Sequence, residues 1–350
     1  MKNIIGAKAD PSAPSVKLIE VGEDGDGQRL DNFLMRQLKG VPKTHVYRII
    51  RSGEVRVNKG RAAADTRLAL GDSVRLPPVR TSARAAEKAA AAPHVPVGRG
   101  FTILHEDESL VAIDKPAGTA VHGGSGVSFG VIEQMRAARP EARFLELVHR
   151  LDRETSGVLL IAKKRSALKN LQDQFRERET GKTYLALVLG AWPANKKVLD
   201  KPLHKYLLAS GEGMVGEGER RVKVVARDDP DGMRAVTLVK VAQRFEGFSL
   251  LEVTIKTGRT HQIRVHLASE GHAIAGDDKY GDFSVNKGLD KSGLKRMFLH
   301  AWRLRFTHPA TGEAVALEAA LPPELAGFLS GLAADPSLPQ RQSNDASPKL

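Results

Sequence analysis

The sequence predicts an α+β fold with a mixed, mainly antiparallel sheet, preceded by a small α/β module. Three observations predict this organisation. Residues 100–330 contain more short apolar strand patterns than helical ones, residues 19–80 follow a helix–helix–strand pattern, and an Ala-rich, Pro-closed stretch at 81–99 separates them. The length of 350 residues suits about two domains of roughly 150 residues each.

The first module begins after a polar stretch interrupted by proline, so residues 1–18 are expected to form a flexible arm. Four apolar residues then recur at helical spacing: Leu30, Phe33, Leu34 and Leu38. Pro42 ends this predicted helix, and a second short helix is predicted from Lys43 to Ser52. Gly53 ends the second helix, and alternating apolar residues predict short strands after it: Val55, Val57, Val74 and Leu76.

This module carries most of the positive charge of the chain. Between Gly27 and Arg80 there are 12 Lys/Arg and 4 Asp/Glu, a net +8 out of +13 for the whole protein. The basic residues on or beside the two helices are Arg36, Lys39, Lys43, Arg48 and Arg51. A solvated helix surface is the alternative explanation, but a whole small module this basic favours binding to phosphate groups of a nucleic acid.

The larger region predicts the main sheet. Its strand-like runs are LVAID, GVLLIAK, TYLALVLG, AVTLVKVAQ and SLLEVTI, and helices are expected near 128–138 and 167–179. Many strands with a few inserted helices are typical of α+β proteins. Residues 331–350 are polar, so we expect a disordered tail.

Composition excludes several classes of protein and site. The chain has no Cys, which excludes disulfide scaffolds, thiolate zinc sites and a Cys nucleophile. It has no run of about 18 apolar residues and no apolar segment near Met1, so we expect a cytoplasmic protein without a membrane anchor or signal peptide. The 11 His residues lack metal-ligand spacing, so no metal is expected.

Two Gly-rich stretches do not support a nucleotide cofactor. Gly211–Gly216 matches G-x-G-x-x-G, but no apolar strand leads into it and nearby Glu residues would repel a pyrophosphate, so a hairpin loop is expected. Gly123–Gly126 lacks the Gly-Lys-Ser/Thr of a P-loop. Ser156 lacks the G-x-S-x-G context of a nucleophile and is interpreted as a turn or capping residue.

The most informative stretch is 148–163, in which Asp152 lies in a Gly-closed polar loop directly before an apolar strand. A buried strand would hold this carboxylate rigidly, as covalent or acid–base chemistry requires, although a turn or capping Asp is the alternative. A second stretch, 256–267, offers Arg259 or Arg264 as a cationic partner for the carboxylate or for phosphate. Tyr184 heads another strand, where it either packs in the core or stacks on a base.

Taken together, these stretches resemble the RluA-type family of pseudouridine synthases over about residues 27–330. The resemblance rests on His149-Arg-Leu-Asp-Arg-Glu-Thr-Ser-Gly157 and on Gly258-Arg-Thr-His-Gln-Ile-Arg264, with Gly271-His and Gly276-Asp after it. The stretches Asp114-Lys-Pro-Ala-Gly118 and Val121-His-Gly-Gly-Ser-Gly126 resemble members acting on the large ribosomal subunit. Arg29-Leu-Asp and Gly53-Glu-Val-Arg-Val-Asn-Lys59 resemble an S4 RNA-binding domain.

The resemblance implies isomerisation of uridine to pseudouridine in 23S rRNA, free or in a large-subunit precursor particle. Asp152 then matches the catalytic aspartate, Arg264 its cationic partner and Tyr184 the residue that stacks on the flipped base. Arg150 matches the residue that enters the RNA where the uridine leaves. Contacts to RNA are also expected from Arg259 and His149, and from the module residues Arg36, Lys43, Arg48 and Arg51.

The expected reaction needs no cofactor, metal or nucleotide, and a monomer is expected. Whether Asp152 attacks C1′ or removes the C2′ proton stays open, since both routes require the carboxylate in the same place. Ala273 replaces the usual Pro after Gly-His, a change expected to be harmless. Two alternatives are a non-catalytic RNA-binding protein of the same fold and an S4-bearing methyltransferase. The complete signature around Asp152 argues against the first, and the lack of a methyl-donor motif argues against the second.

Overall fold

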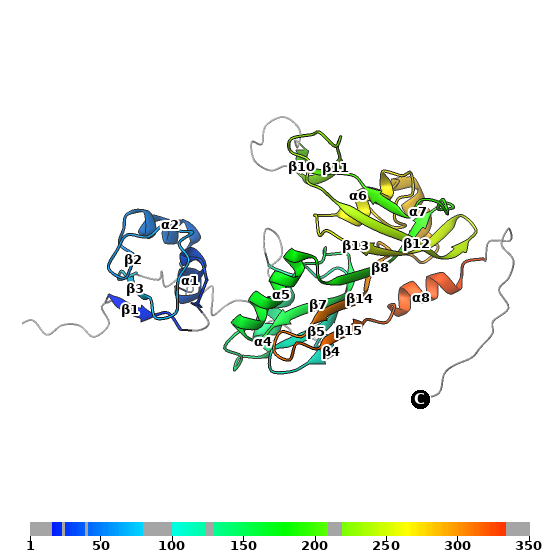
Figure 1. The fold of residues 1–350 in the computed structure, drawn as a ribbon. Helices are drawn as coiled ribbons and strands as arrows, with labels where there is room; N and C mark the ends of the chain where they lie inside the picture. The colour runs from blue at the N-terminus through cyan, green and yellow to red at the C-terminus, as the bar shows by residue number, and fades with distance from the viewer. Residues whose placement is uncertain are drawn as a thin grey trace, which may run out of the picture. The chain divides into compact units, whose positions relative to one another are not determined.

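The computed structural model describes residues 16–22, 25–38, 41–79, 100–123, 129–208 and 219–333. The chain divides into two compact units, Met1–Gly98 and Arg99–Leu350 (Figure 1). The whole predicted linker at 81–99 lies outside the described residues, as do almost all of the predicted arm and tail.

The described residues of the N-terminal unit form a three-stranded antiparallel sheet with two helices. Its elements are β1 (Lys17–Glu20), α1 (Leu30–Gln37), α2 (Lys43–Arg51), β2 (Arg56–Val57) and β3 (Ser73–Leu76), and the strand order is β1-β3-β2. Both predicted helices are confirmed, and α2 ends one residue before the predicted Ser52. β1 begins inside the residues predicted as the arm, because backbone pairing with β3 orders a segment whose side chains are mostly exposed.

Part of the positive charge of this unit holds the unit together. The Arg29 guanidinium pairs with the buried Asp31 carboxylate at 2.8 Å, and the Tyr47 hydroxyl donates to the same carboxylate at 3.1 Å, which ties α1 to α2. Arg67 and Arg75 donate to the backbone carbonyls of Gly27 and Glu54, respectively. These cations therefore contribute to the fold, whereas others lie exposed on its surface.

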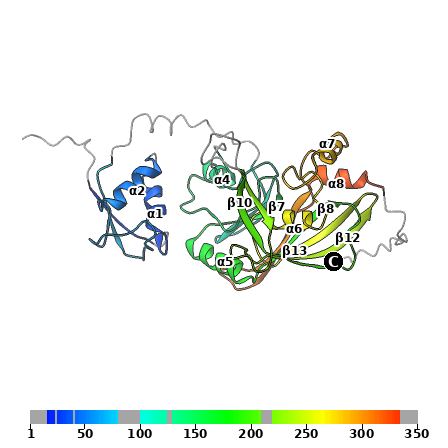
Figure 2. The same cartoon turned by 90° about the horizontal axis from the view of Figure 1, so that it is seen from above.

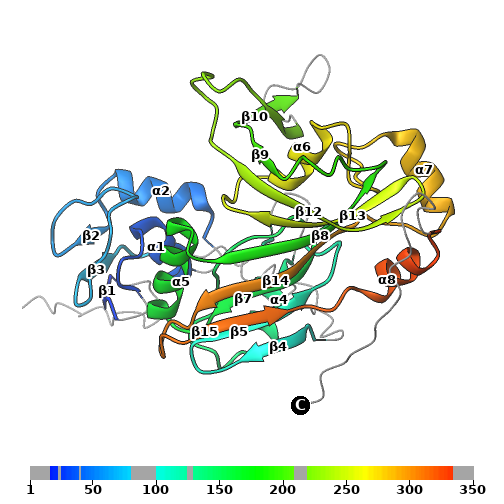
Figure 3. The same cartoon turned by 45° about the vertical axis from the view of Figure 1, so that its right-hand side comes forward.

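The second unit is built on a mixed sheet of ten strands with the order β4-β5-β7-β14-β8-β13-β12-β9, to which β15 adds beside β14 and β6 beside β7. The strands are β4 (Thr102–Glu106), β5 (Leu110–Lys115), β6 (Glu146–Leu147), β7 (Ser156–Ala162), β8 (Gly181–Leu189), β9 (Val198–Asp200), β12 (Val236–Phe245), β13 (Phe248–Ile255), β14 (Leu299–Thr307) and β15 (Ala314–Glu318). Figure 3 shows the long run from β5 to β12. Within this described sheet only β7 and β14 pair in parallel, which confirms the predicted mainly antiparallel arrangement.

In the described part of this unit, five helices accompany the sheet: α4 (Val131–Ala138), α5 (Arg165–Glu177), α6 (Gln262–Ala268), α7 (Phe283–Lys291) and α8 (Pro323–Ser330). Figure 2 shows α4 and α5 toward one end of the unit and α7 and α8 toward the other, with α6 between them. The helices predicted near 128–138 and 167–179 are confirmed as α4 and α5. The other three were not predicted.

β7 is the central support of the predicted catalytic loop, because every one of its seven residues is buried. Its apolar side chains pack on both faces of the sheet, as expected for a strand covered on both sides. Gly157 has a φ of +111°, and a Cβ there would lie 2.2 Å from the Ala301 carbonyl oxygen of β14. Only glycine fits where the loop before β7 joins the sheet.

A hairpin of β10 (Leu203–Leu208) and β11 (Glu219–Val224) extends the unit. The Gly211–Gly216 stretch lies outside the described residues, and the strands on either side of it pair with each other. None of the helices in the described parts of the chain is both long enough and apolar enough to span a membrane.

Candidate active site

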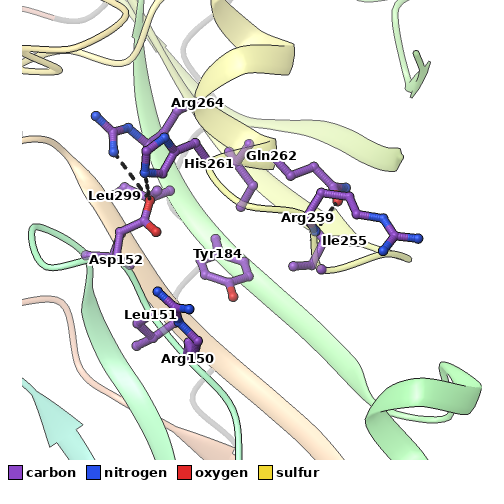
Figure 4. A pocket seen from close by; sticks show the side chains of 13 residues that line it. Arg150, Leu151, Asp152, Tyr184, Ile255, Arg259, His261, Gln262, Arg264 and Leu299 are labelled. Carbon is purple, nitrogen blue, oxygen red and sulfur yellow. Dashed lines mark hydrogen bonds and ion pairs between the residues drawn. The ribbon is translucent and has the colours of Figure 1, made fainter. Parts of the chain in front are cut away.

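A pocket opens where the loop before β7 meets β8, the end of β13 and the start of α6. It has about 470 Å³ of free space, part of it open to solvent. The residues that line it are Arg150, Leu151, Asp152, Thr155, Tyr184, Ile255, Gly258, Arg259, His261, Gln262, Ile263, Arg264 and Leu299. Five predicted site residues, Arg150, Asp152, Tyr184, Arg259 and Arg264, are thus brought together (Figure 4).

Two cationic side chains, Lys115 and Arg296, hold the loop that carries Asp152. The Lys115 ammonium is fully buried and donates to three carbonyl oxygens, including that of Arg153 at 3.1 Å. Arg296 donates to the Glu154 carbonyl oxygen at 3.3 Å and to the Ser156 hydroxyl at 2.8 Å. Burial lowers the pKa of Lys115 to about 8. These contacts fix the backbone that directly follows Asp152.

Arg264 faces two carboxylates at once. Its Nη1 lies 3.4 Å from Asp152 Oδ2, while its Nε and Nη2 bind both oxygens of Asp277 at 2.8 and 2.7 Å. Asp277 is 1% exposed and also accepts backbone N–H groups of Lys279 and Tyr280. This two-point pairing orients the guanidinium, so that one nitrogen is directed at Asp152.

Burial alone would lower the pKa of Arg264, but the hydrogen bonds and charges of Asp277 and Asp152 raise that pKa above its usual value. Burial likewise opposes ionisation of Asp277, and the bonds from Arg264 outweigh it and lower the pKa of that carboxyl. A cation and an anion are therefore retained in a buried place because each is paired and hydrogen-bonded. The Arg264 guanidinium therefore keeps its positive charge beside Asp152.

Tyr184 lies in β8, opposite Val253 of β13, and its side chain is 9% exposed. Burial, together with the charge of Asp152, raises the pKa of Tyr184, so the hydroxyl stays neutral. Arg150 is exposed, and Arg259 is half-buried and donates to the Arg234 carbonyl oxygen at 3.2 Å. Figure 4 shows Arg259 directed away from Asp152, whereas Arg264 points toward it. The arginine that pairs with Asp152 is therefore Arg264.

The loop from 256 to 262 is shaped by a buried glutamine. Gln262 accepts hydrogen bonds from the Thr257 hydroxyl at 2.7 Å and the Arg259 N–H at 3.0 Å. Its amide nitrogen donates to the Val236 carbonyl and the Thr237 hydroxyl. Since the amide is bonded at both ends, it anchors the first residue of α6 to β12.

His149 does not line the pocket, although it was grouped with the RNA-contacting residues. Its ring stacks on Phe175 of α5 with centroids 4.7 Å apart, and its Nε2 accepts the Leu160 N–H at 3.2 Å. Burial and the nearby Lys182 ammonium lower the pKa of His149 to about 3, so the ring is neutral at pH 7. The ring turns inward because the apolar strand β7 runs directly beside it.

Other polar side chains that could have been catalytic or metal-binding are buried and hydrogen-bonded to neighbouring groups of the protein. The buried Ser156 hydroxyl lies 2.9 Å from His300 Nδ1, and both residues are shielded from solvent. His266 is also buried, with its ring nitrogens bonded to the Thr237 hydroxyl and the Lys201 carbonyl. Among the described residues, the one cluster of metal-ligand type consists of His204, Asp229 and Asp231, none of which lines the pocket.

The predicted RNA-contacting residues of the N-terminal unit lie on its helices. Arg36 is in the last turn of α1 and is half-buried, and Lys43 begins α2. Arg48 and Arg51 are exposed in the last turn of α2, where Arg48 contacts the His45 ring. No acidic residue lies in the first turn of that helix, so α2 presents a net positive surface.

Comparison with known proteins identifies the family. The chain is 52% identical over 310 residues to the ribosomal large subunit pseudouridine synthase C of Salmonella typhimurium, a match that covers 87% of this chain and 93% of the relative. The chain belongs to the RNA pseudouridylate synthase family. The family profile matches residues 109–269, and an S4 domain profile matches residues 28–74.

Further members support this assignment. The protein of the same name from Pasteurella multocida is 48% identical over 326 residues, covering 91% of this chain and 94% of the relative. Among solved structures, human RNA pseudouridylate synthase domain containing 4 superimposes with a TM-score of 0.53 at 30% identity, covering 65% of this chain and 92% of the other. The predicted fold and family are therefore confirmed.

Sequence reasoning assigned no role to four residues around Asp152 in this pseudouridylate synthase: Lys115, His261, Asp277 and Tyr280. Asp277 follows Gly276 in a motif that carried part of the resemblance, and Lys115 follows Asp114 in another. Those motifs were the sequence signals that could have identified Asp277 and Lys115. Tyr280 gave none, because a Tyr in a polar turn is indistinguishable from a surface residue until the turn packs against Arg264.

Proposed function

We propose that this protein isomerises specific uridines of large-subunit rRNA to pseudouridine, with Asp152 as its catalytic group. The observation that carries the proposal is the Asp152 carboxylate in an open pocket, 3.4 Å from an Arg264 guanidinium that Asp277 holds in place. Membership of the family and the printed names of the relatives from Salmonella typhimurium and Pasteurella multocida support the reaction and the class of RNA.

The isomerisation breaks the N1–C1′ bond of uridine and joins C5 of the same uracil to C1′. The proton on C5 is lost and N1 gains one, so no atom is gained or lost overall. An ionised carboxylate at the ribose serves either as a nucleophile at C1′ or as a base at C2′. In both routes the Arg264 guanidinium lies beside the reacting carboxylate.

A uridine stacked in an RNA helix hides its C1′ from a side chain, so the nucleotide has to leave the stack at a cost of a few kcal/mol. We assign Tyr184 to the face of the extruded uracil, since its ring lines the pocket within the reach of Asp152. Arg150 is assigned to the space in the RNA from which the uridine departs, because its side chain is exposed at the pocket. Arg259 is assigned to a phosphate.

The S4 domain is proposed to supply affinity through phosphate contacts from Arg36, Lys43, Arg48 and Arg51. We further propose that residues 1–18, 81–99 and 331–350 act as arm, linker and tail around domains at 19–80 and 100–330. The substrate is 23S rRNA, free or within a large-subunit precursor particle, which implies a cytoplasmic location. We also propose that the protein is a monomer.

The proposal is tested by mapping pseudouridines in the rRNA of cells that have or lack this protein. A carbodiimide adduct that stops reverse transcription marks each pseudouridine. We expect a small number of stops to disappear from large-subunit rRNA in the deletion strain and to return with the wild-type gene, but not with an Asp152→Asn gene. Small-subunit rRNA serves as the internal control. Identical maps in both strains would overturn the proposed function.

A further inference from the structure

Two residues that the proposed reaction does not use directly connect the Asp152 carboxylate to the β10–β11 hairpin. His261 Nε2 lies 3.9 Å from Asp152 Oδ2, and His261 Nδ1 lies 2.7 Å from the Tyr280 hydroxyl. The Tyr280 hydroxyl in turn accepts the Val222 N–H of β11 at 3.1 Å. A continuous chain of polar contacts therefore runs from β11 through Tyr280 and His261 to Asp152.

The direction of the hydrogen bonds follows from counting protons. The Tyr280 hydroxyl has one proton to donate, and it already accepts from Val222. Among the described residues, His261 Nδ1 is the one acceptor within hydrogen-bond distance of that hydroxyl. We assign the Tyr280 hydroxyl as the donor to Nδ1, which places the proton of the neutral His261 ring on Nε2, the nitrogen that faces Asp152. Burial raises the pKa of Tyr280 to about 12, so this proton is retained at neutral pH.

Arg264 and His261 approach the same oxygen of Asp152. Arg264 Nη1 lies 3.4 Å from Oδ2 and His261 Nε2 lies 3.9 Å from it. Figure 4 shows the two dashed lines meeting at one carboxylate oxygen. No hydrogen bond or ion pair from any described residue reaches Oδ1. The carboxylate thus has one oxygen faced by donors and one oxygen available in the pocket.

We infer that His261 and Tyr280 are positioning residues that orient Asp152 through Oδ2, so that Oδ1 is the oxygen that acts at the ribose. This inference rests on the proposed function and adds to it the identity of the reacting oxygen. The 3.9 Å separation shortens to a hydrogen bond when RNA fills the pocket and excludes water. Arg264 contributes the positive charge, while His261 contacts the Asp152 carboxylate from a second direction and so prevents its rotation.

The backbone of His261 supports a role beyond capping α6. Its φ of +51° and ψ of +21° lie in the left-handed region, which residues other than glycine seldom adopt. No side-chain hydrogen bond from His261 caps the helix. The left-handed conformation therefore serves to turn the ring toward Asp152 and Tyr280. Burial, aided by the charge of Arg264, also lowers the pKa of His261, consistent with a neutral ring.

The test uses the full-length protein with three variants and an RNA substrate identified by the mapping experiment. Tyr280→Phe removes the donor to Nδ1 and leaves Asp152 and its arginine untouched. His261→Asn removes the Nε2 proton but keeps a residue type that tolerates the left-handed conformation. Tyr206→Phe, on β10, is the matched control, because its ring packs beside Lys223 and its hydroxyl has no hydrogen bond to described residues.

We expect His261→Asn to lower kcat by about 100-fold, the effect of a displacement of roughly 1 Å at a reacting group. Tyr280→Phe should lower kcat by about tenfold, and both variants should keep the wild-type KM and RNA affinity. In the His261→Asn background, Tyr280→Phe should have no further effect beyond about twofold, because the two residues act in series. Tyr206→Phe should keep the wild-type kcat. Wild-type kcat values for His261→Asn and Tyr280→Phe would overturn the inference.

A second measurement does not depend on activity. In nitrogen-15 spectra of the histidine side chains, assigned by the signal lost in His261→Asn, the Nδ1 of His261 should resonate as an unprotonated nitrogen and Nε2 as a protonated one. In Tyr280→Phe the Nδ1 signal should move toward the protonated position. A protonated Nδ1 in the wild-type protein would overturn the inference, even if the enzyme is active. An inactive wild-type protein with the expected tautomer would instead contradict the proposed function.

Discussion

The exposed arginines of the N-terminal unit and the buried arginine of the active site illustrate two uses of the same side chain. Arg48 and Arg51 lie in the last turn of α2 with their side chains in solvent. Arg264 is 8% exposed, is bound at two points by Asp277 and stands above the Tyr280 ring. The first two are free to adapt to a polyanion, whereas the third has a fixed direction.

This difference separates affinity from catalysis. Exposed charges attract RNA over about a Debye length and lose that attraction as salt rises. A buried guanidinium contributes little to long-range attraction, but it stabilises one charge state of one carboxylate in one geometry. Substitutions in the two regions should therefore affect different kinetic constants.

The largest effect is expected for Arg264→Gln. It removes the cation facing Asp152 and leaves the buried Asp277 unpaired, so we expect kcat to fall by about 10²–10³-fold. The free energy of unfolding should fall by about 3–5 kcal/mol, as for other buried pairs that lose one partner. Arg176→Gln, which breaks an exposed pair with Asp173 on α5, is the control and should change neither quantity appreciably. A wild-type kcat for Arg264→Gln would show that Asp152 needs no cationic partner.

An intermediate effect is expected for Lys115→Met. Without the ammonium, three carbonyl oxygens around the Asp152 loop lose their donor. We expect kcat to fall by about tenfold through loss of loop geometry. The measurements are single-turnover pseudouridine formation and urea unfolding, each made on the wild-type protein and on Lys115→Met.

The same lysine predicts a pH dependence. Its pKa is about 8 in the folded protein and 10.5 in an unfolded chain, so the unfolded state binds more protons between these values. This group therefore makes the wild-type protein more stable as pH rises from about 8 to about 10, and Lys115→Met should lack that gain. If the difference in unfolding free energy between the two proteins does not change over this window, the lysine is not buried as a cation.

The smallest effect is expected for the double variant Arg48→Gln and Arg51→Gln. We expect KM for rRNA to rise a few-fold and the slope of log K against log salt to decrease by about 1–2, with kcat unchanged. Lys169→Gln with Arg176→Gln, an equally exposed pair of substitutions on α5, provides a charge-matched control. A fall in kcat with an unchanged salt slope would contradict the separation of the two regions.

The sequence was sufficient for elements whose pattern is local. α1, α2 and α5 have apolar residues at helical spacing, and β7 is a continuous apolar run, so their types could be predicted. α6 could not be predicted, because it has seven residues and buries polar side chains such as Gln262 and His266 beside apolar ones. Periodicity has no meaning for a short helix that is buried on several sides.

The residues of the active site also differ in whether a local sequence pattern could identify them. Asp152 was identified because its loop leads directly into the buried strand and because the surrounding motif resembles a known family. The partners of Arg264 were not identified from the sequence, because Asp277 and Tyr280 contact Arg264 only once the turn after α6 has folded. His149 lies beside Arg150 in the motif, which suggested RNA contact, and its ring packs on Phe175, so contact of His149 with RNA stays a prediction.

The most direct test of the central claim is a paired measurement on Asp152→Asn in the full-length protein: pseudouridine formed in a single turnover, and the dissociation constant for the same rRNA. Asp173→Asn, an aspartate paired with Arg176 on the surface of α5, is the matched control. We expect no detectable pseudouridine from Asp152→Asn, with RNA bound within a few-fold of the wild-type affinity, and full activity from Asp173→Asn. Turnover by Asp152→Asn at near the wild-type rate would contradict the assignment of this carboxylate as the catalytic group.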